Sequence, residues 1–229
     1  LFAQLKTREA DETLVIRSVS LLMRLMETYY GKPVILLMDE YDVPIAKASS
    51  NGYYSQMLSV IRGIMSTALK DNTSLKFAVI TGCLRVAKES IFTGTNNFVS
   101  DTINNSGLDE YFGFTQAEVD KILADADAKE YAECMKNWYD GYHFGKEEIY
   151  NPWSILNYAS REVLEPYWVN TSSNKMIRKA MEGRDLTFAR GYEKLIETGR
   201  LETLVRMETS FFEVSSTDSL WGLFVNAGY

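Results

Sequence analysis

The chain has 229 residues, of which 46% are hydrophobic and 24% are charged, a composition typical of globular proteins. Its formal net charge is −7 and its pI is about 4.9, so it lacks the basic surplus that marks a nucleic-acid-binding surface. Cys83 and Cys134 lie far apart without a CxxC pattern, which argues against a disulfide scaffold or a zinc site. No apolar run approaches the roughly 20 residues of a membrane span. We therefore expect a cytoplasmic protein that contacts no membrane and binds no nucleic acid directly.

The first third of the chain predicts a strand–helix–strand unit. Apolar residues recur every three or four positions over residues 12–30 and 53–70, which predicts a helix in each segment. Between them, 34-VILLM-38 is typical of a parallel strand that is buried on both faces, and a buried helical turn is the alternative. The run 75-LKFAVITG-82 predicts a second strand. A right-handed crossover would make the two strands parallel.

The rest of the chain is predicted to be mainly helical. A capping-box pattern of Thr115 and Glu118 precedes a helix at residues 117–126. The segment 183-GRDLTFARG-191 is polar and flanked by glycine, so we expect a linker or a domain edge there. Helical periodicity resumes over residues 192–226.

Acidic residues directly follow the first predicted strand, in the order Asp39, Glu40 and Asp42. Ligands of open parallel sheets bind beyond the carboxyl ends of the strands, and Thr81 marks the same edge on the second strand. An apolar strand that ends in Asp-Glu is the Walker B pattern, in which one carboxylate holds Mg²⁺ and its neighbour deprotonates or orients the attacking water. We predict that Asp39 is the metal ligand and Glu40 the catalytic base.

The residues after the second strand add to this pattern. A polar side chain at that strand's end can sense a γ-phosphate, and an arginine beyond it can stabilise negative charge on the phosphate. We therefore predict that Thr81 and Lys88 bind the nucleotide and that Arg85 is catalytic. The alternatives are a strand-end hydrogen bond for Thr81 and a solvated helix face for the two cations, with Arg85 paired to Glu89.

Five separated segments carry a recognisable pattern, namely 34-VILLMDEYDVPI-45, 79-VITGCLRVAKESIFTGTNNF-98, 138-WYDGYHFG-145, 150-YNPWSILNY-158 and 171-TSSN-174. Together they resemble the bacterial AAA-ATPase-like family, whose members often carry a restriction-endonuclease-like nuclease domain at the C-terminus. The resemblance runs from about residue 17 to the end of the chain. It implies an α/β fold, namely part of a P-loop NTPase parallel sheet with a Walker B strand, a sensor strand and crossover helices, followed by a mainly helical lid. The family's acidic pair falls on Asp39 and Glu40, and its polar strand end and arginine fall on Thr81 and Arg85.

The resemblance also implies a division of the chain into three parts. Residues 1–113 would form the ATPase core, residues 114–183 the lid, and residues 184–229 a helical extension that leads to a further C-terminal domain. The phosphate loop GxxxxGK[ST], however, is absent from the 229 residues. The nearest match, 141-GYHFGKE-147, has glycine spacing that is one residue short and places Glu147 where a hydroxyl is needed.

The absence of the phosphate loop limits the activity that we expect of this segment alone. We expect the loop upstream in a parent protein that binds and hydrolyses ATP with Mg²⁺, while this segment alone binds no cofactor and is inactive. One alternative is a non-catalytic interaction module, in which the acidic surface meets a protein partner or the chain self-associates. Another is a metal-dependent nuclease that uses Asp39, Glu40 and Asp42, although the chain shows no basic groove for a nucleic-acid backbone.

Overall fold

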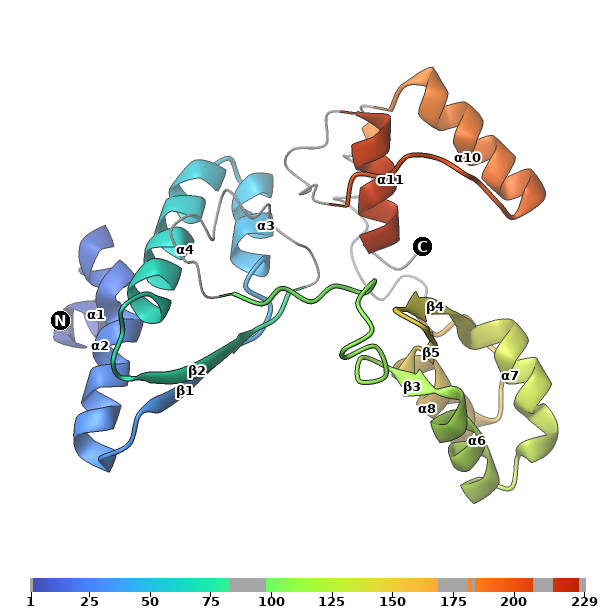
Figure 1. The fold of residues 1–229 in the computed structure, drawn as a ribbon, viewed down its shortest axis with the longest axis horizontal. Coiled ribbons are helices and arrows are strands. Elements are labelled where there is room, and N and C mark those ends of the chain that lie inside the picture. The colour runs from blue at the N-terminus through green and yellow to red at the C-terminus, as the bar shows by residue number, and fades with distance from the viewer. Residues whose placement is uncertain (1, 83–97, 169–180, 183, 208–215, 227–229) are drawn as a thin grey trace. The chain divides into compact units, whose positions relative to one another are not determined.

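The computed structural model describes residues 2–82, 98–168, 181–182, 184–207 and 216–226 (Figure 1). These residues divide into two compact units, unit 1 up to Phe98 and unit 2 from Val99 onward. The predicted three-part division at residues 113 and 183 stays a prediction. The described helices and strands are α1 (Phe2–Thr7), α2 (Glu12–Tyr30), β1 (Val34–Met38), α3 (Val43–Ser50), α4 (Tyr54–Leu69), β2 (Leu75–Ile80), β3 (Phe114–Thr115), α6 (Gln116–Asp125), the 3₁₀ turn η1 (Lys129–Tyr131), α7 (Ala132–Tyr139), β4 (Asp140–Phe144), β5 (Glu147–Tyr150), α8 (Pro152–Arg161), α10 (Leu186–Thr198) and α11 (Thr217–Asn226).

Unit 1 is built around the parallel pair β1 and β2, with α3 and α4 between them in the chain. The pairing places Val34 opposite Leu75 and Met38 opposite Ile80. Helix α2 begins at its cap Asp11, whose side chain accepts a hydrogen bond from the Leu14 backbone N–H, and ends at Gly31 in the left-handed conformation. The two expected strands and their parallel pairing are therefore present, while the larger P-loop NTPase sheet stays a prediction.

The hydrophobic core of unit 1 lies on one face of β1 and β2. Tyr41, Ile45 and Met65 are buried there, and Met38 and Ile80 pack against them. The opposite face of β1 is open in the described residues, because Ile35 and Leu37 are 46% and 72% exposed. The prediction that this strand is buried on both faces is therefore wrong for the part of the chain that the structure describes.

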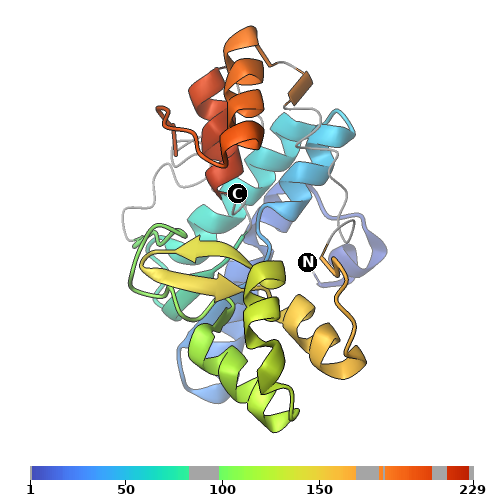
Figure 2. The same cartoon turned by 90° about the vertical axis from the view of Figure 1, so that its right-hand side faces the viewer.

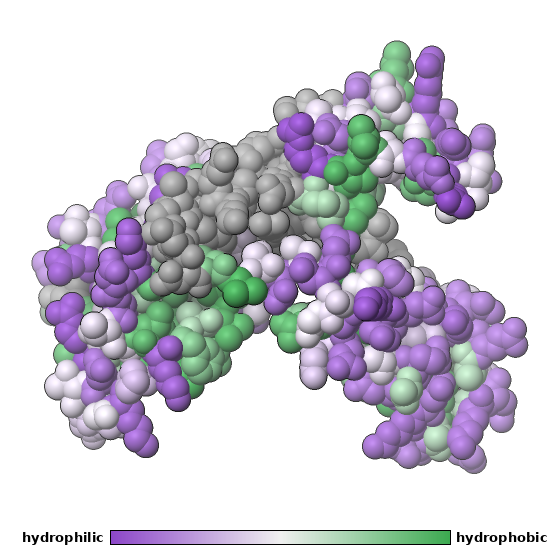
Figure 3. Space-filling model, in the orientation of Figure 1, coloured by the Kyte–Doolittle hydropathy of each residue, from purple (hydrophilic) through white to green (hydrophobic). Residues whose placement is uncertain are grey.

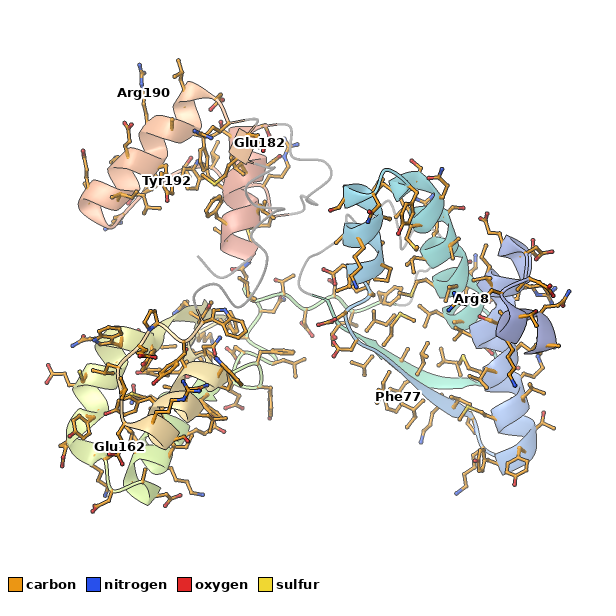
Figure 4. The ribbon with its side chains drawn as sticks, turned by 180° about the vertical axis from the view of Figure 1, so that it is seen from behind. Arg8, Phe77, Glu162, Glu182, Arg190 and Tyr192 are labelled. Atoms are coloured by element: carbon orange, nitrogen blue, oxygen red, sulfur yellow. The ribbon has the colours of Figure 1, made fainter. Side chains whose placement is uncertain are left out.

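Strand β2 shares this open face. Its Phe77 and Val79 are the register partners of Ile35 and Leu37, and both are exposed. Figure 4 shows Phe77 on the side of the strand that points away from the helices. Figure 3 shows hydrophobic surface over this part of unit 1. The apolar residues of β1 therefore lie in two different environments, one face on the core of unit 1 and the other exposed in the described structure.

The first part of unit 2 contains a small antiparallel sheet with strand order β3–β5–β4, visible at β4 and β5 as yellow arrows in Figure 2. A two-residue turn at Gly145 and Lys146 joins the two longer strands. The expectation of a mainly helical lid missed this sheet. Helix α6 begins with the predicted capping box, in which Thr115 and Glu118 bond each other's backbone N–H groups. The core of this part consists of Val119, Leu123, Ala128, Met135, Tyr139, Tyr150, Ile155 and Tyr158.

Helices α10 and α11 form a separate packed pair. Asp185 caps α10 by accepting a hydrogen bond from the Phe188 N–H at 2.7 Å, and its carboxylate also accepts one from the Thr217 hydroxyl. Phe188 is fully buried, with its ring centroid 4.3 Å from that of Trp221. Of the two alternatives for 183–191, a linker or a domain edge, the linker is therefore wrong from Leu186 onward, because a buried phenylalanine anchors this polar stretch as a helix. None of the helices in the described ranges is long and apolar enough to cross a membrane.

Candidate functional site at the carboxyl edge of strands β1 and β2

The backbone ladder of β1 and β2 continues past the ends of both strands. The Thr81 N–H donates to the Met38 carbonyl at 2.8 Å, and the Tyr41 N–H donates to the Thr81 carbonyl at 3.1 Å. Asp39 and Glu40 thus form a short arch between two residues that are both bonded to the end of β2. The position of the acidic pair is consequently set by the neighbouring strand as well as by its own.

The carboxylate of Asp39 is held at one oxygen. Its Oδ1 accepts a hydrogen bond from the Glu40 N–H at 2.9 Å and a second from the Thr81 hydroxyl. Both donors in the described structure reach this same oxygen, so Oδ2 stays available to a ligand. Asp39 is exposed. As predicted, the acidic pair and Thr81 therefore lie together at the carboxyl edge of β1 and β2.

Glu40 has a left-handed backbone with φ of 54°. This conformation is uncommon for a residue with a Cβ and is held here by the surrounding bonds, since the Glu40 carbonyl accepts from the Val43 N–H at 3.1 Å. The turn places an exposed Glu40 directly ahead of α3. Its side chain is thus available to water at the same edge as Asp39.

Beneath the arch, the chain is closely packed against Gly82. A Cβ built on Gly82 would lie 2.6 Å from Cε1 of Tyr41 and 2.7 Å from Oδ1 of Asp42. Tyr41 is buried and Asp42 is 5% exposed, so neither can swing freely into solvent. The absence of a side chain at Gly82 therefore allows the end of β2 to approach the turn that carries the acidic pair. Sequence reasoning missed this contact, although the glycine at the end of the predicted strand run 75–82 was its visible signal.

The structure brings together three of the five predicted site residues, Asp39, Glu40 and Thr81. Arg85 and Lys88 lie outside the described residues, and their roles stay predictions. Asp42 is buried at the start of α3, whereas Asp39 and Glu40 are exposed. Across the described ranges no three His, Cys, Asp or Glu side chains cluster as a metal site. This arrangement does not favour the three-carboxylate nuclease alternative.

The donor atoms at this edge fit Mg²⁺ better than a softer metal. Mg²⁺ prefers oxygen ligands and is usually held by one or two carboxylates, with water and substrate phosphates completing the shell. The exposed Asp39 carboxylate, oriented through one oxygen with the other available, suits that mode. A single oriented carboxylate does not by itself make a tight all-protein metal site, so a bound phosphate group would have to contribute.

Comparison with known families bears on the same segment. Residues 2–92 match the family model described as a predicted AAA-ATPase. The match includes β1, the acidic pair, β2 and Thr81, and it supports kinship of this part of the chain with an AAA-ATPase-like family.

A curated relative extends the similarity beyond that segment. A protein of Azotobacter chroococcum mcd 1, named "Uncharacterized protein in vnfD 5'region", is 27% identical over 200 residues, which cover 87% of this chain and 37% of the relative. The chain thus spans little more than a third of that protein's length. No solved structure matches the chain.

Proposed function

We propose that this chain forms part of the catalytic site of an ATPase that requires Mg²⁺. The observation that carries the proposal is the joining of Asp39 and Thr81 at the carboxyl ends of two parallel strands, inside the segment that matches the predicted AAA-ATPase family. In this proposal the chain contributes the acidic residues of the site, Asp39 and Glu40. The printed sequence contains no GxxxxGK[ST] loop, so we propose that another part of a longer protein supplies the main phosphate contacts.

Each residue has a separate task in the proposal. Asp39 would hold Mg²⁺ through its second oxygen, directly or through water. Glu40, one residue further along the arch, would accept a proton from the attacking water. The metal would supply positive charge against the phosphates. Arg85 and Lys88 would follow the sensor strand toward the phosphates, as the sequence predicts.

The proposal is tested with the full-length protein that contains this chain. We expect Mg²⁺-dependent ATP binding by calorimetry and ATP hydrolysis by phosphate release. Glu40→Gln keeps the size and polarity of the side chain but removes the base, so hydrolysis should fall roughly 10²–10⁴-fold while ATP still binds. Asp39→Asn should weaken the dependence of ATP binding on Mg²⁺.

The controls separate the acidic pair from general damage. Glu9→Gln changes an exposed glutamate near the start of unit 1 and should leave hydrolysis unchanged. Residues 1–229 alone should show no turnover. Equal hydrolysis by Glu40→Gln and the unmodified protein would remove Glu40 from the mechanism, and a full-length protein that binds no nucleotide would end the proposal.

A further inference from the structure

We propose that Thr81 is a positioning residue for Asp39, rather than a contact to the γ-phosphate. This inference rests on the proposed function and assigns Thr81 a different role from the sensor role that the sequence predicts. It begins with the hydrogen bond in which the Thr81 hydroxyl donates to Oδ1 of Asp39.

A threonine hydroxyl has one proton to donate. A phosphate oxygen is an acceptor, so a direct contact from Thr81 to a phosphate requires that same proton. While the proton is given to Asp39, the hydroxyl can only accept, for example from a water molecule. Contact with a phosphate would therefore break the bond that orients the carboxylate.

The second donor to Asp39 explains why the bond to Thr81 matters. The Glu40 N–H reaches Oδ1 from the adjacent residue and restrains the carboxylate from its own strand only. Thr81 restrains it from the neighbouring strand, because its backbone is bonded to both Met38 and Tyr41. Two donors on one oxygen leave the other oxygen in a defined place for a cation. Charge-assisted hydrogen bonds of this kind are the stronger ones in proteins.

The test measures ATP binding to the full-length protein by calorimetry, as a function of Mg²⁺ concentration and separately in EDTA. Thr81→Val keeps the branched shape but loses the hydroxyl, and Thr81→Ser keeps the hydroxyl. We expect Thr81→Val to raise the Mg²⁺ concentration for half-maximal ATP binding about tenfold, consistent with the loss of one hydrogen bond to a charged group. ATP affinity in EDTA should be unchanged, and Thr81→Ser should restore the Mg²⁺ dependence.

Thr67→Val is the matched control. Thr67 lies in α4 of the same unit, and its hydroxyl donates to the Ile16 carbonyl at 2.9 Å, away from the acidic pair. Its loss should leave the Mg²⁺ dependence unchanged.

Three results separate the explanations. If Thr81→Val lowers ATP affinity equally with and without Mg²⁺, Thr81 contacts the nucleotide and the inference is wrong. A Mg²⁺ dependence equal to that of the unmodified protein also overturns it, while the proposed function stands. If the unmodified protein shows no Mg²⁺-dependent ATP binding, the proposed function fails and this inference fails with it.

Discussion

The close packing at Gly82 makes Gly82→Ala the sharpest test of how the acidic pair is held. The added Cβ would lie 2.6 Å from the Tyr41 ring, where ordinary contacts begin at 3.4 Å. The ring would have to retreat by roughly 0.8 Å in an interior that is already close-packed. Tyr41 is buried in the core with Ile45 and Met65, so we expect the strain to separate the end of β2 from the turn. Overpacking of this kind costs about 1–3 kcal/mol.

Native-state hydrogen exchange measures this effect directly. The Thr81 and Tyr41 N–H groups close the ladder on either side of the acidic pair. A local cost of about 1–3 kcal/mol should accelerate their exchange roughly 5- to 150-fold, with smaller changes in α2. Gly107→Ala is the control, because a Cβ there meets nothing within 4 Å and the residue lies in unit 2. Unchanged exchange at both amides in Gly82→Ala would refute the claim that this approach holds the turn.

Two further predictions concern unit 2. The pKa of Asp140 is raised by burial and by the charge of Glu148, so ionisation of Asp140 in the folded protein should cost stability as pH rises above the ordinary pKa of 3.8. Asp140→Asn should therefore be more stable than the unmodified chain in chemical denaturation at pH 7 and equal to it at pH 3; equal stability at both pH values would contradict this. Phe188→Ala should destabilise the α10–α11 pair by about 3–5 kcal/mol, because it empties a fully buried site against Trp221. Trp fluorescence reports the change through Trp221, whose ring lies against that of Phe188. Tyr192→Ala, at a partly exposed neighbour labelled in Figure 4, should cost less, and equal losses in both variants would contradict this prediction.

The sequence predicted well those features that are decided locally or by one strong pattern. The capping box at Thr115, the helix predicted over residues 12–30 and the two apolar strands all depend on residues that lie close together in the chain. The convergence of Asp39 and Thr81 followed from topology, because parallel strands place their carboxyl ends at one edge.

Features that depend on contacts between residues far apart in the chain were harder to predict from the sequence. A run of apolar residues does not reveal whether one or both faces of a strand are covered, and Leu37 is 72% exposed. The hairpin of β4 and β5 was missed, because both strands are short and β5 begins with two adjacent glutamates, Glu147 and Glu148, in place of the alternation that marks a strand. The start of α10, residues 186–191, was read as a linker or a domain edge, because its stability comes from Phe188 against Trp221, more than 30 residues away in the chain.

The register of β1 and β2 ties the candidate site to the fold. Side chains alternate between the two faces of a strand, so a slip of one residue would turn Thr81 away from Asp39 and exchange Ala78 and Ile80 for Phe77 and Val79 on the face that packs on the helices. The core therefore selects the register that also joins the hydroxyl to the carboxylate. The site residues need not stabilise the sheet themselves, because the apolar contacts beneath them already fix where they meet. Substitutions at Asp39 or Thr81 should consequently change ligand binding far more than folding, which makes them suitable probes of the proposed ATPase site.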